Sequence, residues 1–160
     1  MEPFDPADVE WQRVSPRLAT ARRLLFAASA AVLVIALVVI EVLSGWTWLL
    51  IGIPIVVIAV VVQWLIVGRQ VRSVGYAERE DDLLVRHGIM FRDLVVVPYG
   101  RMQYVDVRSG PIDRAFGIAN VQLHTASPGT DAHIPGLTPD EAARLRDRLA
   151  RRGEARLAGL

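Results

Sequence analysis

The stretch LLFAASAAVLVIALVVIEVL, from Leu24 to Leu43, contains a single ionisable side chain, Glu41. A second stretch, WTWLLIGIPIVVIAVVVQWLIV from Trp46 to Val67, contains none. At about 1.5 Å of rise per residue, a helix over either stretch spans roughly 30 Å, which is the thickness of a bilayer's hydrocarbon core. Buried helices of a water-soluble domain would each keep a polar face, and neither stretch has one. The sequence therefore predicts a two-helix transmembrane hairpin over residues 24–67.

The distribution of arginine around this hairpin predicts its orientation. Basic residues concentrate in the cytoplasmic segments next to membrane spans, and the connector Ser44-Gly45 has none. We therefore expect a multi-pass protein of the bacterial plasma membrane with both termini in the cytoplasm and residues 1–23 as a cytoplasmic segment. The first apolar run begins too late and is too long for a cleavable signal peptide, so it is expected to be a retained anchor. The flanking arginines are Arg13, Arg17, Arg22 and Arg23 before the first span and Arg69 and Arg72 after the second.

The hairpin itself offers few functional groups. Glu41 lies close to the outer end of its helix, so contact with lipid headgroups competes with a proton or ion site as its role. Tryptophans suit membrane interfaces, and Trp46 and Trp48 are expected at the outer one and Trp64 at the inner one. Pro54 is expected to kink the second helix.

The composition of the 160-residue chain excludes several classes of chemistry. The chain has no cysteine, which rules out disulfides, thiolate nucleophiles and cysteine-ligated metals. The net charge is +1, which gives no global signal for nucleic-acid binding, so no nucleic-acid partner is expected.

From Ser73 onward the pattern changes to short runs of β-forming residues divided by turn residues. A helix is expected to follow, because Thr138-Pro139-Asp140-Glu141 matches a capping box. Strands followed by an amphipathic helix predict an α+β domain over residues 73–152, with residues 153–160 as a flexible tail. The expected strands are 73–79, 82–87, 93–98, 102–108, 118–125 and a short one near 132–134, with a helical turn at 112–116 and a hairpin turn at Gly88.

A more specific signal runs from Val97 to Val107, VPYGRMQYVDV, and from Gly110 to Ala119, GPIDRAFGIA. VQLHTA at residues 121–126 and IPGL at 134–137 continue the pattern. With Trp11, Ser15-Pro16-Arg17 and the two-helix hairpin upstream, this chain resembles the bacterial pleckstrin-homology (PH) domain membrane proteins (YdbS-like). The resemblance implies a PH-like β-barrel capped by a C-terminal helix, but it implies little about biochemistry, because this fold hosts many binding roles.

Catalytic and metal-binding patterns are not found in the sequence. The three histidines, His87, His124 and His133, form no HExxH motif, and no glycine-rich phosphate loop precedes a helix. The protein is therefore expected not to be an enzyme, with no catalytic residue, cofactor or metal ligand.

Two surfaces remain as candidates for binding. The segment 101–117 is a candidate protein-contact surface, and the basic C-terminal helix is a candidate contact for anionic lipid. The leading hypothesis is a membrane-anchored binding or scaffold module in homo- or hetero-oligomers with related PH-like membrane proteins. The alternatives are peripheral sensing of anionic lipid and a part in a transport or stress-protection complex. The candidate residues are Arg101, Gln103, Asp106, Arg108 and Arg114 for protein contact, and Arg144, Arg148, Arg151 and Arg152 for lipid contact.

Overall fold

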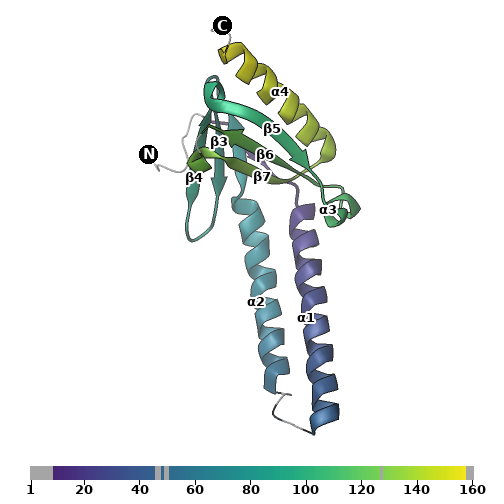
Figure 1. Cartoon of the computed structure of the whole chain (residues 1–160). Coiled ribbons are helices and arrows are strands. Elements are labelled where there is room, and N and C mark those ends of the chain that lie inside the picture. Colours follow the sequence, from purple (N-terminus) through teal and green to yellow (C-terminus); the bar gives the residue numbers. More distant parts are fainter. Residues whose placement is uncertain (1–8, 46–47, 49–50, 127, 158–160) are drawn as a thin grey trace. The chain divides into compact units, whose positions relative to one another are not determined.

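The computed structural model describes residues 9–45, 48, 51–126 and 128–157 (Figure 1). The chain divides into two compact units. One is the helical unit, Ala19–Arg69, and the other, here called the sheet domain, joins the N-terminal segment up to Leu18 to Gln70–Leu160.

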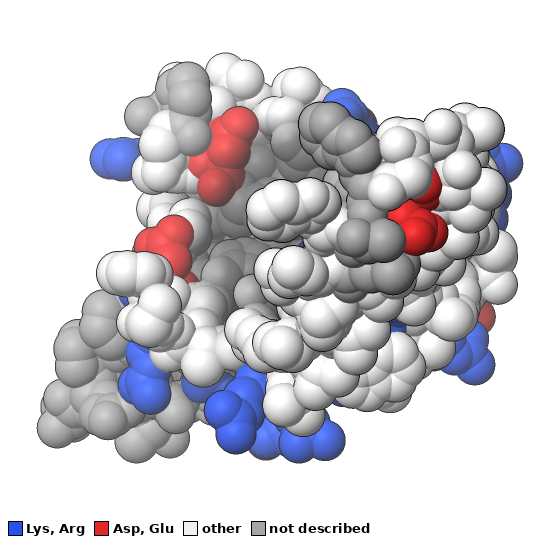
Figure 2. All heavy atoms as spheres, turned by 90° about the horizontal axis from the view of Figure 1, so that it is seen from below, with Lys and Arg blue, Asp and Glu red and all other residues white. Residues whose placement is uncertain are grey.

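The helical unit consists of most of α1 (Arg17–Ser44) and α2 (Gly52–Ser73). Both helices are long and apolar enough to cross a membrane, as the sequence predicts. Most of their large apolar side chains are exposed, which lipid tolerates and water does not. In the space-filling view of Figure 2 most of the visible surface is uncharged, and arginines and carboxylates form separate small patches.

The helix ends differ from the expected ones for local reasons. Helix α1 begins at Arg17, whose backbone N–H donates to the Ser15 hydroxyl (3.3 Å). It ends before Gly45, which adopts the left-handed conformation (φ 70°) that commonly terminates helices. Helix α1 includes Ser44, and α2 begins at Gly52, later than the predicted start at Trp46.

Pro54 therefore lies in the first turn of α2 and does not kink the middle of the helix. A backbone N–H in the first turn has no hydrogen-bond partner within its own helix, so a proline there removes no helical hydrogen bond. The predicted interface residue Trp46 lies outside the described residues, whereas Trp48 is exposed.

One close contact joins the two helices near the arginine-flanked ends of the spans. The Arg23 guanidinium lies over the Trp64 ring, 4.9 Å from its centroid. A Cβ atom at Gly68 would lie 2.5 Å from the same guanidinium, so glycine leaves the room that Arg23 occupies. The stacked pair combines a cation with an aromatic ring that suits a membrane interface.

The sheet domain contains two antiparallel sheets. The first has the strand order β1-β2-β3-β4, and the second has the order β5-β6-β7. The first sheet comprises β1 (Gln12–Arg13), β2 (Gly75–Glu78), β3 (Asp82–His87) and β4 (Asp93–Pro98). The second comprises β5 (Met102–Arg108), β6 (Ala119–Thr125) and β7 (Ala132–Leu137).

The expected strands are thus present, but the N-terminal segment adds one that the sequence did not indicate. Gln12 pairs with Tyr76 and Arg13 with Gly75, so β1 forms the edge of the first sheet. The Arg86 guanidinium lies over the ring of Trp11, 4.3 Å from its centroid, and holds this edge in place. A two-residue strand shows no periodicity, so only its neighbours reveal it.

The PH-like fold is present in part, because the two sheets do not close into the expected barrel. Among the described strands, no ladder of hydrogen bonds joins β4 to β5 or β1 to β7. The 3-10 helix η2 (Tyr99–Arg101) connects the sheets, and the short helix α3 (Pro111–Ala115) connects β5 to β6. Another 3-10 helix, η3 (Pro128–Thr130), precedes β7.

The C-terminal helix α4 (Pro139–Leu157) covers β5, β6 and η2, as expected for the capping helix. Ala142, Leu145 and Leu149 form its buried stripe. The Glu141 N–H donates to the Thr138 hydroxyl and the Thr138 N–H to the Glu141 carboxylate (both 3.3 Å), which confirms the capping box. The helix continues to Leu157, so residues 153–157 are helical and do not belong to a flexible tail.

Candidate functional site

A polar groove of about 470 Å³ lies between α4 and the β1–β2 edge of the first sheet. Pockets for small molecules have similar volumes but are lined mostly by apolar side chains. Carboxylates and guanidinium groups dominate this lining, which suits a charged polypeptide better than an apolar ligand. The lining residues, here called the α4 groove, are Glu10, Gln12, Tyr76, Glu78, Glu141, Arg144, Arg148 and Arg152.

The central contact of the α4 groove is the ion pair between Arg148 and Glu78. The Arg148 Nη2 atom donates to Glu78 Oε1 at 2.7 Å, and Nε lies 3.2 Å from both carboxylate oxygens. The Glu78 side chain is 11% exposed and the Arg148 side chain 38%. Hydrogen bonds from Arg148 to Glu78 raise the pKa of the guanidinium above its ordinary value, so Arg148 keeps its charge.

The next turn of α4 binds the β2–β3 turn and η2. Arg152 Nη1 donates to the Arg79 carbonyl oxygen (2.9 Å) and to the Tyr99 hydroxyl oxygen (2.7 Å). The Tyr99 hydroxyl itself donates to the Arg79 carbonyl (3.1 Å), and burial raises the pKa of this phenol. One turn further, Arg156 pairs with Asp81. The arginines of this face therefore offset the acidic β2–β3 turn.

Tyr76 forms the floor of the groove and is 2% exposed. Burial raises the pKa of its phenol to about 12, and the Glu141 and Glu78 carboxylates act in the same direction. Tyr76 is therefore a neutral group at any physiological pH.

The four arginines proposed for lipid contact divide into two pairs. Arg148 and Arg152 are held by Glu78, Tyr99 and the Arg79 carbonyl, so their charges are used inside the sheet domain. Arg144 and Arg151 are exposed, and neither forms an ion pair with another residue in the described part of the chain. Arg144 is the one of these two that borders the groove.

The five residues proposed for protein contact lie on η2, β5 and α3, away from the groove lining. Arg101, Gln103, Arg108 and Arg114 are exposed, and Asp106 is half-buried. Arg108 Nη2 lies 3.2 Å from Asp106 Oδ2, which is the Arg–Asp pairing that the sequence suggested for this segment. None of these five side chains lines the α4 groove.

Asp113 fixes the loop around α3. Its Oδ2 accepts hydrogen bonds from the Gly110 N–H (3.1 Å) and from the Asn120 amide nitrogen (2.8 Å). The Asn120 amide oxygen in turn accepts from the Gly136 N–H at 3.1 Å. Asp113 of the GPIDRAFGIA motif and Asn120 thus link α3, β6 and β7 through hydrogen bonds.

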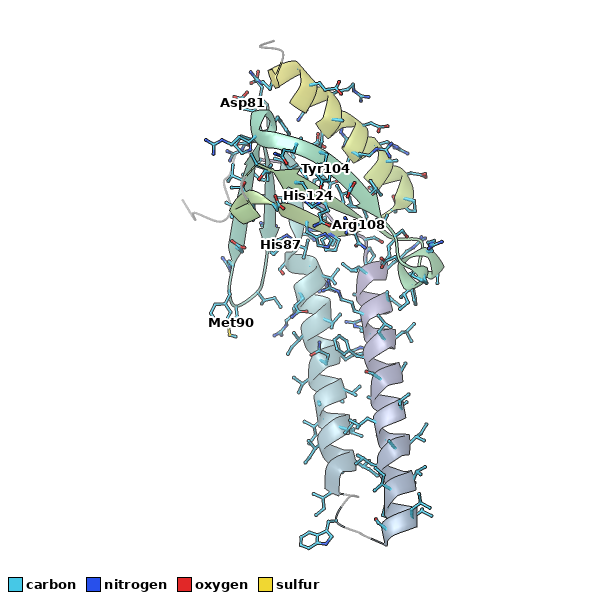
Figure 3. All side chains as sticks on the ribbon, viewed as in Figure 1. Asp81, His87, Met90, Tyr104, Arg108 and His124 are labelled. Atoms are coloured by element: carbon cyan, nitrogen blue, oxygen red, sulfur yellow. The ribbon has the colours of Figure 1, made fainter. Side chains whose placement is uncertain are left out.

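A second polar cluster lies on the second sheet. The His124 ring stacks on Tyr104 with 4.4 Å between centroids, and His124 Nδ1 lies 3.3 Å from Asp131 Oδ2. The Thr125 N–H donates to Asp131 (2.8 Å), which together with His124 lowers the pKa of this carboxyl group. Figure 3 labels Tyr104 and His124 on adjacent strands. An Asp–His pair orients an imidazole, and the Thr125 hydroxyl also donates to Asp131 (3.3 Å).

The comparisons with known proteins agree with this architecture. Residues 21–153 match the family model described as "Bacterial PH domain". The chain belongs to the bacterial PH domain family. This match extends from the first helix to α4, so the family unit includes the helical hairpin as well as the sheets.

A relative of this PH-domain protein is the "UPF0699 transmembrane protein YdbS" of Bacillus subtilis (strain 168). The two are 29% identical over 133 residues, which cover 81% of this chain and 82% of the relative. No solved structure matches the chain.

Most of the groove in this PH-domain protein was not identified from sequence. Glu10 and Tyr76 are distant in the chain and belong to no motif, Glu141 was identified only as part of the capping box, and β1 itself was missed. Arg148 and Arg152 were identified, but as lipid contacts. The i, i+4 spacing of Arg144, Arg148, Arg152 and Arg156 was the available signal, because it places four arginines on one helix face.

Proposed function

We propose that this protein is a non-enzymatic, membrane-anchored PH-like module that binds a partner protein at the cytoplasmic face of the bacterial plasma membrane. The two helices serve as the anchor, and the arginines that flank them orient both termini toward the cytoplasm. The partner is a second copy or a related PH-like membrane protein, which gives a homo- or hetero-oligomeric scaffold.

The α4 groove is the observation that carries this proposal. It is lined by three carboxylates and three arginines in a pocket large enough for several side chains. Charges of both signs at fixed positions select a partner with the complementary pattern. Arg144 and Glu141 are exposed at its border, where an incoming segment would meet them first.

The same geometry makes lipid sensing through α4 the weaker alternative. Each exposed arginine near an anionic membrane contributes about 1 kcal/mol. Internal pairing of Arg148 and Arg152 removes two of the four proposed lipid-contact charges and leaves Arg144 and Arg151. Arg156, further along α4, is paired with Asp81 as well.

Site-specific photo-crosslinking of the full-length protein in native membranes tests the proposal. A photoreactive amino acid replaces Arg144 at the groove, and a matched variant carries it at Arg146 on the same helix, outside the groove lining. We expect a discrete protein adduct from position 144 and little or none from 146. An adduct mass of twice the chain identifies a second copy, and another mass identifies a different partner.

Two results contradict the proposal. Adducts with lipid alone at position 144 would favour the lipid alternative. Equal yields from positions 144 and 146 would show that the groove selects no partner.

A further inference from the structure

The tip of the β3–β4 hairpin exposes three consecutive large apolar side chains. Met90 is 85% exposed, Phe91 84% and Ile89 41%. Figure 3 shows Met90 at the far end of the hairpin, pointing away from the sheet. Exposed apolar clusters of this kind mark contact surfaces, because leaving them in water is unfavourable.

The backbone of the tip is fixed by glycine. His87 pairs with Asp93 across the hairpin, and Gly88 adopts φ 93° directly after the paired residue. A Cβ atom at Gly88 would lie 1.7 Å from the Phe91 carbonyl oxygen, so the turn permits only glycine. The exposed residues are thus presented by a formed turn that strand pairing holds.

The strand register places this tip at the end of the sheet where the chain arrives from both helices. Gly75, the first residue of β2 after α2, pairs with Arg86, which lies two residues before Gly88. On its other side Gly75 pairs with Arg13, four residues before α1 begins. Because β2 leaves this end and β3 returns to it, the tip and the two connections to the spans share one end of the sheet.

The lengths of the segments are compatible with contact between the tip and the bilayer. From Val67, the last residue of the apolar run, to Ser73, α2 rises about 9 Å. From Arg86 to Met90 an extended chain reaches at most about 13 Å beyond the level of Gly75. The tip can therefore extend further than the length of the α2 segment that separates the apolar run from β2.

Charge distinguishes the two ends of the first sheet. The end with the tip carries Arg13, Arg86 and Arg92, with Asp93 as its acidic residue. The opposite end is the β2–β3 turn, with Arg79 and the three carboxylates Glu80, Asp81 and Asp82, of which Asp81 is paired with Arg156 of α4. A basic, apolar end suits anionic headgroups above acyl chains, and an acidic end does not.

We propose that Ile89, Met90 and Phe91 insert into the interface of the bilayer that holds the helices, as a third attachment point for the sheet domain. The inference rests on the membrane anchoring proposed above and is independent of the α4 groove. Insertion would fix the orientation of the domain, and hence the direction in which the groove faces.

Because the chain has no cysteine, single-cysteine labelling of the full-length protein in proteoliposomes with anionic lipid tests this directly. An environment-sensitive fluorophore is attached to Met90→Cys and, in a second variant, to Phe91→Cys. Glu80→Cys at the opposite end of β3 is the matched control, and Val38→Cys in α1 reports on the anchor. Quenchers are a nitroxide on lipid acyl chains and iodide in the water.

We expect the labels at 90 and 91 to be quenched by the lipid nitroxide several-fold more than the label at 80, and to be protected from iodide. Iodide quenching equal to that at position 80 would overturn the proposal. Protection from both quenchers would overturn it as well, because protein would then cover the tip. If the Val38 label also escapes lipid quenching, the membrane anchoring itself fails, which distinguishes the two failures.

Discussion

At the residue scale, the contact between Glu78 and Arg148 decides how α4 is attached to the first sheet. The Glu78 side chain is 11% exposed, and its carboxylate accepts hydrogen bonds from both Nη2 and Nε of the guanidinium. Removing one partner of a desolvated ion pair destabilises a protein by more than the net contribution of the pair to stability, because the other charge is left without a partner.

Glu78→Ala is therefore expected to lower the free energy of unfolding of the sheet domain by about 2 kcal/mol, between the values for exposed and fully buried pairs. Denaturant or thermal unfolding of the full-length protein in detergent measures the change. Asp147→Ala is the control, because its pair with Arg146 is exposed on both sides and should contribute less than about 0.5 kcal/mol. Equal effects of the two substitutions would show that the Glu78–Arg148 pair contributes no more to stability than an exposed ion pair.

The raised pKa of Tyr76 predicts that the sheet domain loses stability at alkaline pH. Its pKa is about 12 in the folded protein and about 10 in an unfolded chain, so the folded state holds the phenolic proton more tightly. The corresponding stability is fully present below pH 10 and is lost as the pH rises from about 10 to about 12.

Unfolding of the wild type and Tyr76→Phe should therefore be compared between pH 9 and pH 12. Phenylalanine does not ionise, so this variant should lose less stability over the window, and the latest rise in tyrosinate absorbance should disappear. Identical alkaline profiles would contradict the assignment of the raised pKa to Tyr76.

At the scale of elements, the β3–β4 hairpin depends on a single backbone conformation. Gly88 has φ 93°, and the Phe91 carbonyl occupies the space that a side chain would need. Gly88→Ala is expected to lower the free energy of unfolding by at least about 1 kcal/mol. Faster hydrogen exchange of the β3 and β4 amides should accompany the loss.

Gly129→Ala is the matched control for this substitution. A Cβ atom at Gly129 would have no neighbouring atom within 4 Å, so the Gly129→Ala variant should be about as stable as the wild type. Unchanged exchange in β3 and β4 of Gly88→Ala would show that the turn tolerates a different conformation.

At the scale of the whole molecule, two short connections join the helices α1 and α2 to the first sheet. Residues 14–16 lie between β1 and α1, and Val74 alone lies between α2 and β2. Since the two strands next to these connections pair with each other, both spans lead into one end of one sheet. Two short connections limit the freedom of the sheet domain more than one flexible linker would.

The proposed orientation is tested with two further single-cysteine variants. A membrane-impermeant maleimide should label Ser44→Cys, at the end of α1, in intact cells. It should label Arg151→Cys, on α4, only after the membrane is permeabilised. The reverse pattern would place the sheet domain outside the cell and contradict the positive-inside interpretation.

Local sequence patterns were sufficient to predict several features of the fold. Length and apolarity identified both helices, and strands 82–87, 93–98 and 102–108 have the expected bounds. The capping box at Thr138 and the turn at Gly88 were predicted because the required residues are close neighbours in the chain. The helix ends were less accurate, since capping by Ser15 and Gly45 acts outside the apolar runs.

Contacts between residues that are distant in the chain could not be predicted from such patterns. Arg148 and Glu78 are separated by 70 residues, and their pairing depends on how α4 lies across the sheet. The same holds for strand β1, for two sheets in place of a closed barrel, and for the end of the sheet that carries Met90 and Phe91. The physical reason is that the register between strands and the rotation of a helix on a sheet are set by packing of the whole core, which no local pattern contains.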